Sequence, residues 1–243
     1  PEPIRLSSFA DTGVQIGTAY TYVVRSVSRR GVESEPTAPI EAVARIVMEP
    51  IFTPIFDGQI RGQFYGGQEV PGKQHGAARM ADGTLDLSDG GHVTFEHDDR
   101  FDLTQPISVE CWVRFDKQGA MPVLVGCGHW RQAGWFLQQI GDGWRWHVGG
   151  LDCDGGKVEP NRWIHLAAVS DGSTLRLYQD GKLVGEQTGS INTTVWPGQL
   201  HVGQYSGTPA PEYQVTGQMK DVKLYHRPLE AAEVAQAAKT RPE

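Results

Sequence analysis

Two Asp-Gly turns separate three strand-like segments between residues 163 and 185, and this pattern constrains the fold more than any other feature. The turns lie at Asp171-Gly172 and Asp180-Gly181. Between them, residues 174–178 alternate apolar and polar side chains, which is the period of a strand with one buried face. Asp-Gly supplies the positive φ angles of tight hairpin turns. The region is therefore predicted to be an antiparallel meander, which favours a β-sandwich over a helical enzyme scaffold.

Composition narrows the class of protein further. A chain of 243 residues with 30 glycines and 15 prolines suits one large sandwich of many short strands, or one plus a fragment. No apolar run approaches the roughly 18 residues of a membrane span, so we expect no membrane insertion. The net charge of −7, without a basic stripe, disfavours nucleic acid as a partner. The chain begins at Pro1 without a visible signal peptide, and we interpret it as a piece of a longer polypeptide.

Strand-like segments recur from about residue 84 onward and one helix closes the chain. The predicted helix covers residues 228–236, which are rich in alanine and open with a proline. Many strands and one short helix predict an all-β fold, a two-sheet antiparallel jelly-roll sandwich with a C-terminal helix. The predicted strands are residues 91–96, 107–115, 122–126, 134–140, 143–149, 163–170, 174–179, 182–189, 200–204 and 216–225.

The first 45 residues differ from the rest of the chain. YTYVVRSV at residues 20–27, a turn at Arg30-Gly31 and SEP at residues 34–36 resemble the closing strands of a fibronectin type III domain. The resemblance covers only the second half of such a domain, and half a sandwich leaves strand edges unpaired. We therefore expect upstream domains of the same polypeptide to supply the missing strands. The predicted organisation is a partial fibronectin type III-like segment at 1–45, a Gly/Pro-rich connection at 46–80 and a jelly roll at 81–243.

Residues from about 84 to 238 resemble laminin-G-like jelly-roll domains of the concanavalin A-like superfamily. Several sequence pieces carry the resemblance in the right order. They are GGHVTF at 90–95, FDL at 101–103 with ISVECWV at 107–113, RWIHLA at 162–167, LRLYQDG at 175–181, and GQMKDVKLY at 217–225 with RPL at 227–229. The fold hosts lectins, adhesion modules, glycosidases and lyases, so the resemblance implies a fold more firmly than a function.

Paired acids on one strand, as catalytic relatives of this fold carry them, are missing from the sequence. Alternate spacing would place two carboxylates on one face, where they can flank a glycosidic bond. The densest acidic run, residues 96–99, is interpreted as a solvated turn. No Gly-x-Ser-x-Gly or His-Glu-x-x-His motif occurs either. We therefore expect the chain not to be an enzyme.

Candidate ligand-binding residues gather in the tryptophan-rich stretch between residues 112 and 163. In WRWHV at 144–148, Trp144 and Trp146 share one face of a strand, which is predicted to face the core, and Arg145 and His147 share the other. Sugar recognition uses such polar groups together with an aromatic platform. Trp130 lies outside any alternating run and is predicted to be an exposed platform.

Two glycine-flanked loops complete the predicted carbohydrate site. One contains His129 beside the platform; the other contains Asp152 and Asp154, whose carboxylates accept hydrogen bonds from sugar hydroxyls or serve calcium. Tyr205 is expected to line the same end of the sandwich. The alternatives are an ordinary hairpin turn at 152–156 and a partly buried edge position for Tyr205. His165 is interpreted as a packed core residue.

The three cysteines leave two interpretations open. Cys127 and Cys153 both stand beside glycines at predicted strand ends, so a disulfide between them would tie the two loops together; the alternative is three buried thiols. Cys111 is expected to be a small core residue. The family resemblance also implies a structural calcium ion, with Asp89 and Asp221 at the places comparable to the family's calcium-binding acids. Calcium takes six to eight oxygens.

The sequence thus favours a non-catalytic carbohydrate-binding module of a larger secreted polysaccharide-active enzyme, with bacterial polysaccharide degradation as the setting. Its expected partners are a polysaccharide or oligosaccharide and the upstream domains of its own polypeptide, and its expected place is outside the cell or on its surface. The alternatives are a structural module that packs on a catalytic domain, a cell-surface adhesion domain, and an unrecognised jelly-roll glycosidase or lyase.

Overall fold

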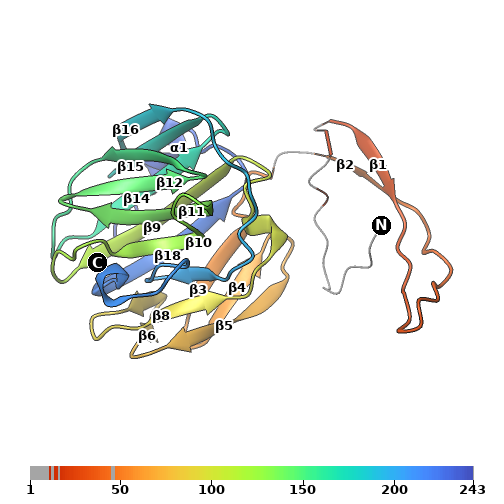
Figure 1. Cartoon of the computed structure of the whole chain (residues 1–243), viewed down its shortest axis with the longest axis horizontal. Coiled ribbons are helices and arrows are strands. Elements are labelled where there is room, and N and C mark those ends of the chain that lie inside the picture. The colour runs from red at the N-terminus through yellow and green to blue at the C-terminus, as the bar shows by residue number, and fades with distance from the viewer. Residues whose placement is uncertain (1–10, 12–13, 16, 45–46, 243) are drawn as a thin grey trace. The chain divides into compact units, whose positions relative to one another are not determined.

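The computed structural model describes residues 11, 14–15, 17–44 and 47–242. The chain divides into two compact units, Pro1–Ile46 and Val47–Glu243, which are described separately (Figure 1). In the smaller unit, β1 (Ala19–Tyr22) pairs with β2 (Ile40–Val43) in antiparallel register. Two strands do not establish a fibronectin type III sandwich, so that resemblance stays a prediction; its residues 1–10 lie outside the described part.

The larger unit is a sandwich of two antiparallel sheets (Figure 1). Sheet A has the strand order β13-β12-β11-β10-β17-β8-β5, and sheet B has the order β4-β3-β18-β9-β14-β15-β16 with the pair β6–β7 beside β18. The strands of sheet A are β5 (Glu69–His75), β8 (His92–Phe95), β10 (Val123–His129), β11 (Ala133–Ile140), β12 (Gly143–Val148), β13 (Leu151–Gly155) and β17 (Leu200–Val202).

Strand β5 also pairs with β4 and so joins the two sheets at one side. The loops contain two short 3-10 helices, η1 (Asp99–Phe101) and η2 (Pro211–Tyr213), and the helix α1 (Ala231–Ala237) lies near the C-terminus. The strands of sheet B are β3 (Phe52–Phe56), β4 (Ile60–Phe64), β6 (Arg79–Ala81), β7 (Thr84–Asp86), β9 (Ile107–Phe115), β14 (Ile164–Ser170), β15 (Thr174–Gln179), β16 (Lys182–Thr188) and β18 (Gly217–Tyr225).

The core lies between the sheets and follows the alternation of the strands. On β12, Trp144 and Trp146 are fully buried in the core, while Arg145 and His147 lie on the outer face, as the sequence predicted. The all-β sandwich with a C-terminal helix is confirmed. His165 is 2% exposed and packs as expected. Among the described residues, no helix has the length and apolar character needed to cross a membrane.

The connection predicted for residues 46–80 is wrong, because strands β3 to β6 of the sandwich lie there. Its glycines serve close packing rather than loop flexibility. A side chain at Gly62 would overlap the ring of Phe52, and one at Gly72 would overlap Ile60. Residues of these strands, such as Phe52 and Phe64, are buried in the main core. Prolines and glycines that lie within these strands were therefore wrongly interpreted as loop residues.

The flexible turn predicted at residues 152–156 is instead β13, and the turn before it uses Gly149 and Gly150, both with positive φ.

The position of β13 also decides whether Cys127 and Cys153 can form a disulfide. Cys127 lies on β10 and Cys153 on β13, with β11 and β12 between them. Three strand spacings make about 14 Å, and a disulfide needs Cα atoms about 4–7 Å apart. The predicted disulfide is therefore wrong, and all three cysteines are buried free thiols.

Candidate functional site

A pocket of about 280 Å³ opens on the outer face of sheet A. Strands β10 to β12 form one wall, and the segment after β17 that contains η2 forms the other. Four of the seven residues predicted for carbohydrate binding line this pocket. The lining residues are Met121, His129, Trp130, Phe136, Gln138, Ile140, Arg145, Tyr205, Thr208 and Tyr213.

Aromatic rings give the pocket a rigid apolar wall. The ring of Tyr205 lies 4.9 Å from that of Tyr213 and 5.3 Å from that of Phe136, measured between centroids. The Tyr205 hydroxyl accepts a hydrogen bond of 2.5 Å from the backbone N–H of Trp130, which fixes the loop between β10 and β11. The Trp130 side chain is 44% exposed, with the guanidinium of Arg131 4.5 Å from its ring. Trp130 is thus exposed beside the pocket, and its role as a sugar-binding platform stays a prediction.

Charged side chains order the opposite side of the site. The Arg145 guanidinium donates two hydrogen bonds of 2.7 Å to Asp154 and lies 3.2 Å from Asp152. Because the Asp154 carboxylate accepts these hydrogen bonds, the pKa of Arg145 is raised. His147 stacks beneath Phe136 at 4.4 Å and lies 2.5 Å from Asp152 through Nδ1. Burial favours a protonated Asp152, but the contact with His147 and the charges of Arg145 and Arg131 together outweigh it and lower the pKa of that carboxyl.

The structure thus sorts the predicted residues into three roles. His129, Trp130, Arg145 and Tyr205 line the pocket. Asp152 and Asp154 bind Arg145 rather than facing the pocket, and His147 is buried below its floor. Six of the ten lining residues were not predicted from the sequence, among them Gln138 and Tyr213. Gln138 lies two residues after Phe136 on β11 and so shares its outer face, a signal that the strand pattern contained; Tyr213 lies in the short helix η2, for which the sequence contained no signal.

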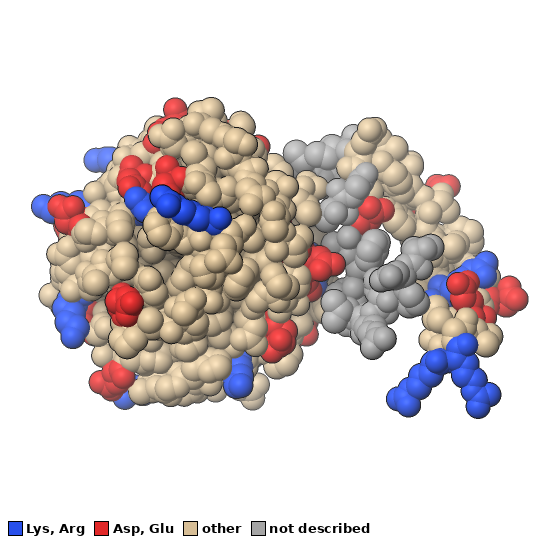
Figure 2. All heavy atoms as spheres, in the orientation of Figure 1, with Lys and Arg blue, Asp and Glu red and all other residues tan. Residues whose placement is uncertain are grey.

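The surface around the site has no dominant sign of charge. No acidic residue lines the pocket among the residues that the structure describes. On the face shown in Figure 2, acidic and basic side chains of residues 47–242 are scattered among uncharged ones. Because Arg145 is neutralised by its two carboxylates, the pocket presents aromatic and neutral polar groups to a ligand.

The two acids predicted to hold calcium do not form one site. Asp89 pairs with Arg79 at 2.6 Å, and Asp221 is exposed at a bulge of β18 with a φ of 52°. The backbone N–H of Leu87 donates a hydrogen bond to the carbonyl of Gly217, and at the other end of the same pairing Thr84 lies opposite Lys220. Gly217 and Lys220 are three residues apart on β18, about 10 Å, and Asp89 and Asp221 lie beyond opposite ends of this pairing. The residues present do not fit a calcium ion shared by these two carboxylates.

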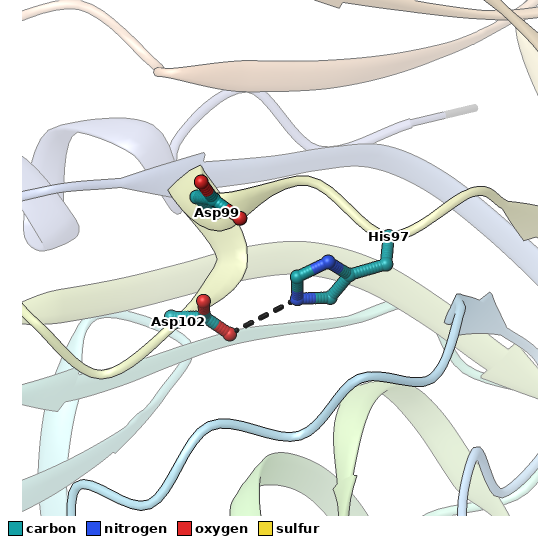
Figure 3. A group of neighbouring side chains, drawn as sticks. All are labelled: His97, Asp99 and Asp102. Carbon is teal, nitrogen blue, oxygen red and sulfur yellow. Dashed lines mark hydrogen bonds and ion pairs between the residues drawn. The ribbon is translucent and has the colours of Figure 1, made fainter. Parts of the chain in front are cut away.

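One group of potential ligand atoms does converge elsewhere. Among the described residues, ligand atoms of His97, Asp99 and Asp102 all lie within 4.8 Å of one another in the turn after β8 (Figure 3). His97 Nε2 lies 3.2 Å from the Asp102 carboxylate. Burial raises the pKa of Asp102, although His97 opposes the shift. The hydrogen bond holds the turn, and neither Asp89 nor Asp221 belongs to this group.

Solved structures with the same fold are distant in sequence. The binding domain of botulinum neurotoxin serotype D, in complex with N-acetylneuraminic acid, matches with a TM-score of 0.63 and 12% identity; the match covers 79% of this chain and 50% of that one. Domain 4 of AbnA, an extracellular arabinanase of Geobacillus stearothermophilus in complex with arabinotriose, matches with a TM-score of 0.57 and 17% identity, over 78% of this chain and 99% of that one. The chain thus spans about half the length of the toxin domains that it matches.

A comparison with curated proteins finds no match. A family model does match, and it covers residues 87–235, from the end of β7 into α1. It therefore spans most of both sheets and includes strands β10 to β12 of the pocket. The chain belongs to the concanavalin A-like lectin/glucanases superfamily.

Proposed function

We propose that this chain is a non-catalytic carbohydrate-binding module of a larger secreted polysaccharide-active enzyme. The observation that carries the proposal is the pocket on sheet A, where an exposed tryptophan stands beside stacked tyrosines and neutral polar groups. Aromatic faces bind the C–H faces of sugars, and side chains such as Gln138 and Arg145 bind their hydroxyls. The likeness to the arabinanase domain, which was solved with arabinotriose, supports a glycan as the ligand.

The lining of the pocket argues for binding rather than catalysis. Hydrolysis of a glycosidic bond uses two carboxyl groups about 5 to 9.5 Å apart that flank the bond. Two acids next to the lining residue Arg145, Asp152 and Asp154, are bound to its guanidinium. A general acid needs a carboxyl group that stays protonated near neutral pH, whereas the pKa of Asp152 is lowered. These features favour the binding module over a glycosidase.

The test is a titration of the whole chain with arabinotriose, N-acetylneuraminic acid and a panel of plant and algal oligosaccharides. Trp130→Ala should weaken binding of the responding sugar about 10- to 100-fold, the loss expected for one large aromatic contact. The melting temperature should stay unchanged because Trp130 is 44% exposed. Tyr65→Ala is the matched control, since Tyr65 has the same exposure and lies in the turn between β4 and β5.

The outcomes separate the candidate functions. Binding that depends on Trp130 but not on Tyr65 supports the carbohydrate-binding module. Binding of no glycan by the folded chain would contradict it and would favour a structural module that packs on a neighbouring domain. Release of reducing ends from any oligosaccharide would instead show a glycosidase, and unfolding of Trp130→Ala would show that the site is misplaced.

A further inference from the structure

A second hollow, of about 370 Å³, lies on the outer face of sheet B, the sheet that does not carry the Trp130 pocket. Strands β6, β7 and β18 contribute most of its lining. Gln218 on β18 lies opposite Asp86 on β7 and Arg114 on β9, and Lys220 lies opposite Thr84 on β7. The strand pairing therefore sets a row of polar side chains at fixed spacing across three strands.

The hollow offers both hydrogen-bond donors and acceptors. Burial opposes ionisation of Asp86, but hydrogen bonds from Ser88 and Gln218 outweigh it and lower the pKa of this carboxyl, so it stays an acceptor. Lys220 also lines the hollow, and its ammonium makes no ion pair with any residue that the structure describes. Arg79 lines the hollow as well and is partly engaged by Asp89.

A buried donor without a partner adds an independent observation. The side chain of Trp163 lines the hollow and the residue is only 6% exposed, yet its indole N–H has no hydrogen-bond partner. Native structures rarely leave a buried donor without a hydrogen-bond partner. A ligand in the hollow would contact the Trp163 side chain, so the resonance of its indole N–H reports on binding there.

We propose that this hollow is a second saccharide-binding site and that it takes neutral sugars. An anionic ligand would meet the carboxylates of Asp82 and Asp86, and a cationic one would meet Arg79 and Lys220. Sugar hydroxyls both donate and accept, so a neutral saccharide satisfies donors and acceptors together. With sites on the outer faces of both sheets, the module binds a polysaccharide at two points and gains avidity beyond either site alone.

The experiment is a ¹H–¹⁵N NMR titration of the whole chain carrying Trp130→Ala, which removes the platform of the first pocket. The probes are arabinotriose, xylotriose, cellotriose, maltotriose and mannotriose at millimolar concentration. At least one should shift the indole N–H resonance of Trp163. Adding Lys220→Ala and Gln218→Ala should weaken that binding about tenfold or more. Lys182→Ala is the control, because Lys182 is an exposed lysine on β16.

Three results would overturn the proposal. They are no shift of the Trp163 indole resonance with any of the five trisaccharides, an equal affinity after Lys220→Ala and Gln218→Ala, and binding of trigalacturonate alone, which would show an anion site. Loss of binding at the Trp130 pocket is measured separately, in the chain without these changes. Failure of one site is therefore distinguishable from failure of the other.

Discussion

The outer faces of the two sheets each carry a cluster of acids and bases, and the two clusters differ in what covers them. On sheet B, the Glu110 carboxylate lies 3.7 Å from His165, 3.0 Å from Lys223 and 2.7 Å from the Tyr225 hydroxyl. Glu110 is 4% exposed. On sheet A, Arg145 binds Asp154, whose side chain is 50% exposed.

The difference follows from the chain segments that pack on each face. On sheet B, the segment that leads into α1 buries Leu229 and Val234 against Tyr225 and its neighbours. This packing leaves no room for a ligand beside Glu110. On sheet A, the segment with η2 packs through Tyr205 against Phe136 and leaves the pocket open. Similar residue types are therefore buried under a covering segment on one sheet and lie beside an open pocket on the other.

The largest expected effect comes from breaking the buried cluster. Glu110→Ala removes the buried carboxylate that binds Lys223 and the Tyr225 hydroxyl; because the Lys223 side chain is 35% exposed, we expect a stability loss of about 2–4 kcal/mol rather than the full cost of breaking a fully buried pair. Urea unfolding followed by fluorescence measures the loss. A change below about 1 kcal/mol would show that the two clusters do not differ in the way their burial indicates.

A stack of three histidines on sheet A predicts a pH dependence of stability that differs from that of the Glu110 cluster on sheet B. The rings of His75, His92 and His201 stack at centroid distances of 4.4 and 5.3 Å. Burial, reinforced by the neighbouring imidazoles, lowers the pKa of His92 and of His201 to about 4. Burial likewise lowers the pKa of His75, and the charge of Lys73 adds to the shift.

Because the unfolded histidines titrate near 6.5, the unfolded chain binds more protons between about pH 6.5 and 4, so stability falls as the pH falls through this window. We expect the free energy of unfolding to fall by about 2 kcal/mol, a value discounted for the partial exposure of His75 and His92.

The variant His92→Gln should remove much of this pH dependence of stability, whereas His129→Gln should not. Urea unfolding at pH 7 and pH 5 measures it. Glu110, with its pKa lowered to about 2, loses its contribution only below about pH 4.5, so the two effects separate. Equal pH dependence in both variants would refute the assignment to the stack.

A smaller effect tests how the pocket holds its platform. Tyr205→Phe keeps the aromatic wall but removes the hydroxyl that accepts the hydrogen bond from the Trp130 backbone. We expect a stability loss of about 1 kcal/mol and binding weakened about three- to tenfold because the loop is held less firmly. Calorimetric titration of the responding glycan measures the affinity. An affinity equal to that of the unchanged chain would mean that the loop needs no support from Tyr205.

Local patterns predicted most strands from residue 84 onward, because β12 and β15 alternate apolar and polar side chains and glycine turns separate several of the others. The assignment of Trp144 and Trp146 to the core and of Arg145 to the outer face needed nothing beyond this period. Strands β3 to β6 were missed because Gly62 and Gly72 serve packing between residues far apart in sequence. Such packing leaves no local signal.

The candidate site was predicted in part for the same reason. Trp130 stood out because it interrupts the alternation, and the structure exposes it. His147 was predicted to contact a ligand, but Phe136 on the neighbouring strand covers it, which only the strand pairing reveals. The distance between Cys127 and Cys153 likewise depends on two strands that separate them. Sequence thus assigns faces of strands, whereas the neighbours across a sheet require the structure.

The smallest expected effect completes the comparison with Glu110. Asp154→Ala removes the bidentate partner of Arg145 but leaves Asp152 3.2 Å from the guanidinium. Because the Asp154 side chain is 50% exposed, we expect a stability loss of about 0.2–1 kcal/mol. Affinity for a neutral glycan should change less than about threefold, whereas the freed Arg145 should strengthen binding of a carboxylated sugar at low salt. Urea unfolding and calorimetric titrations at two salt concentrations measure these effects. A stability loss as large as that of Glu110→Ala would show that the cluster on sheet A is a structural support like its counterpart on sheet B.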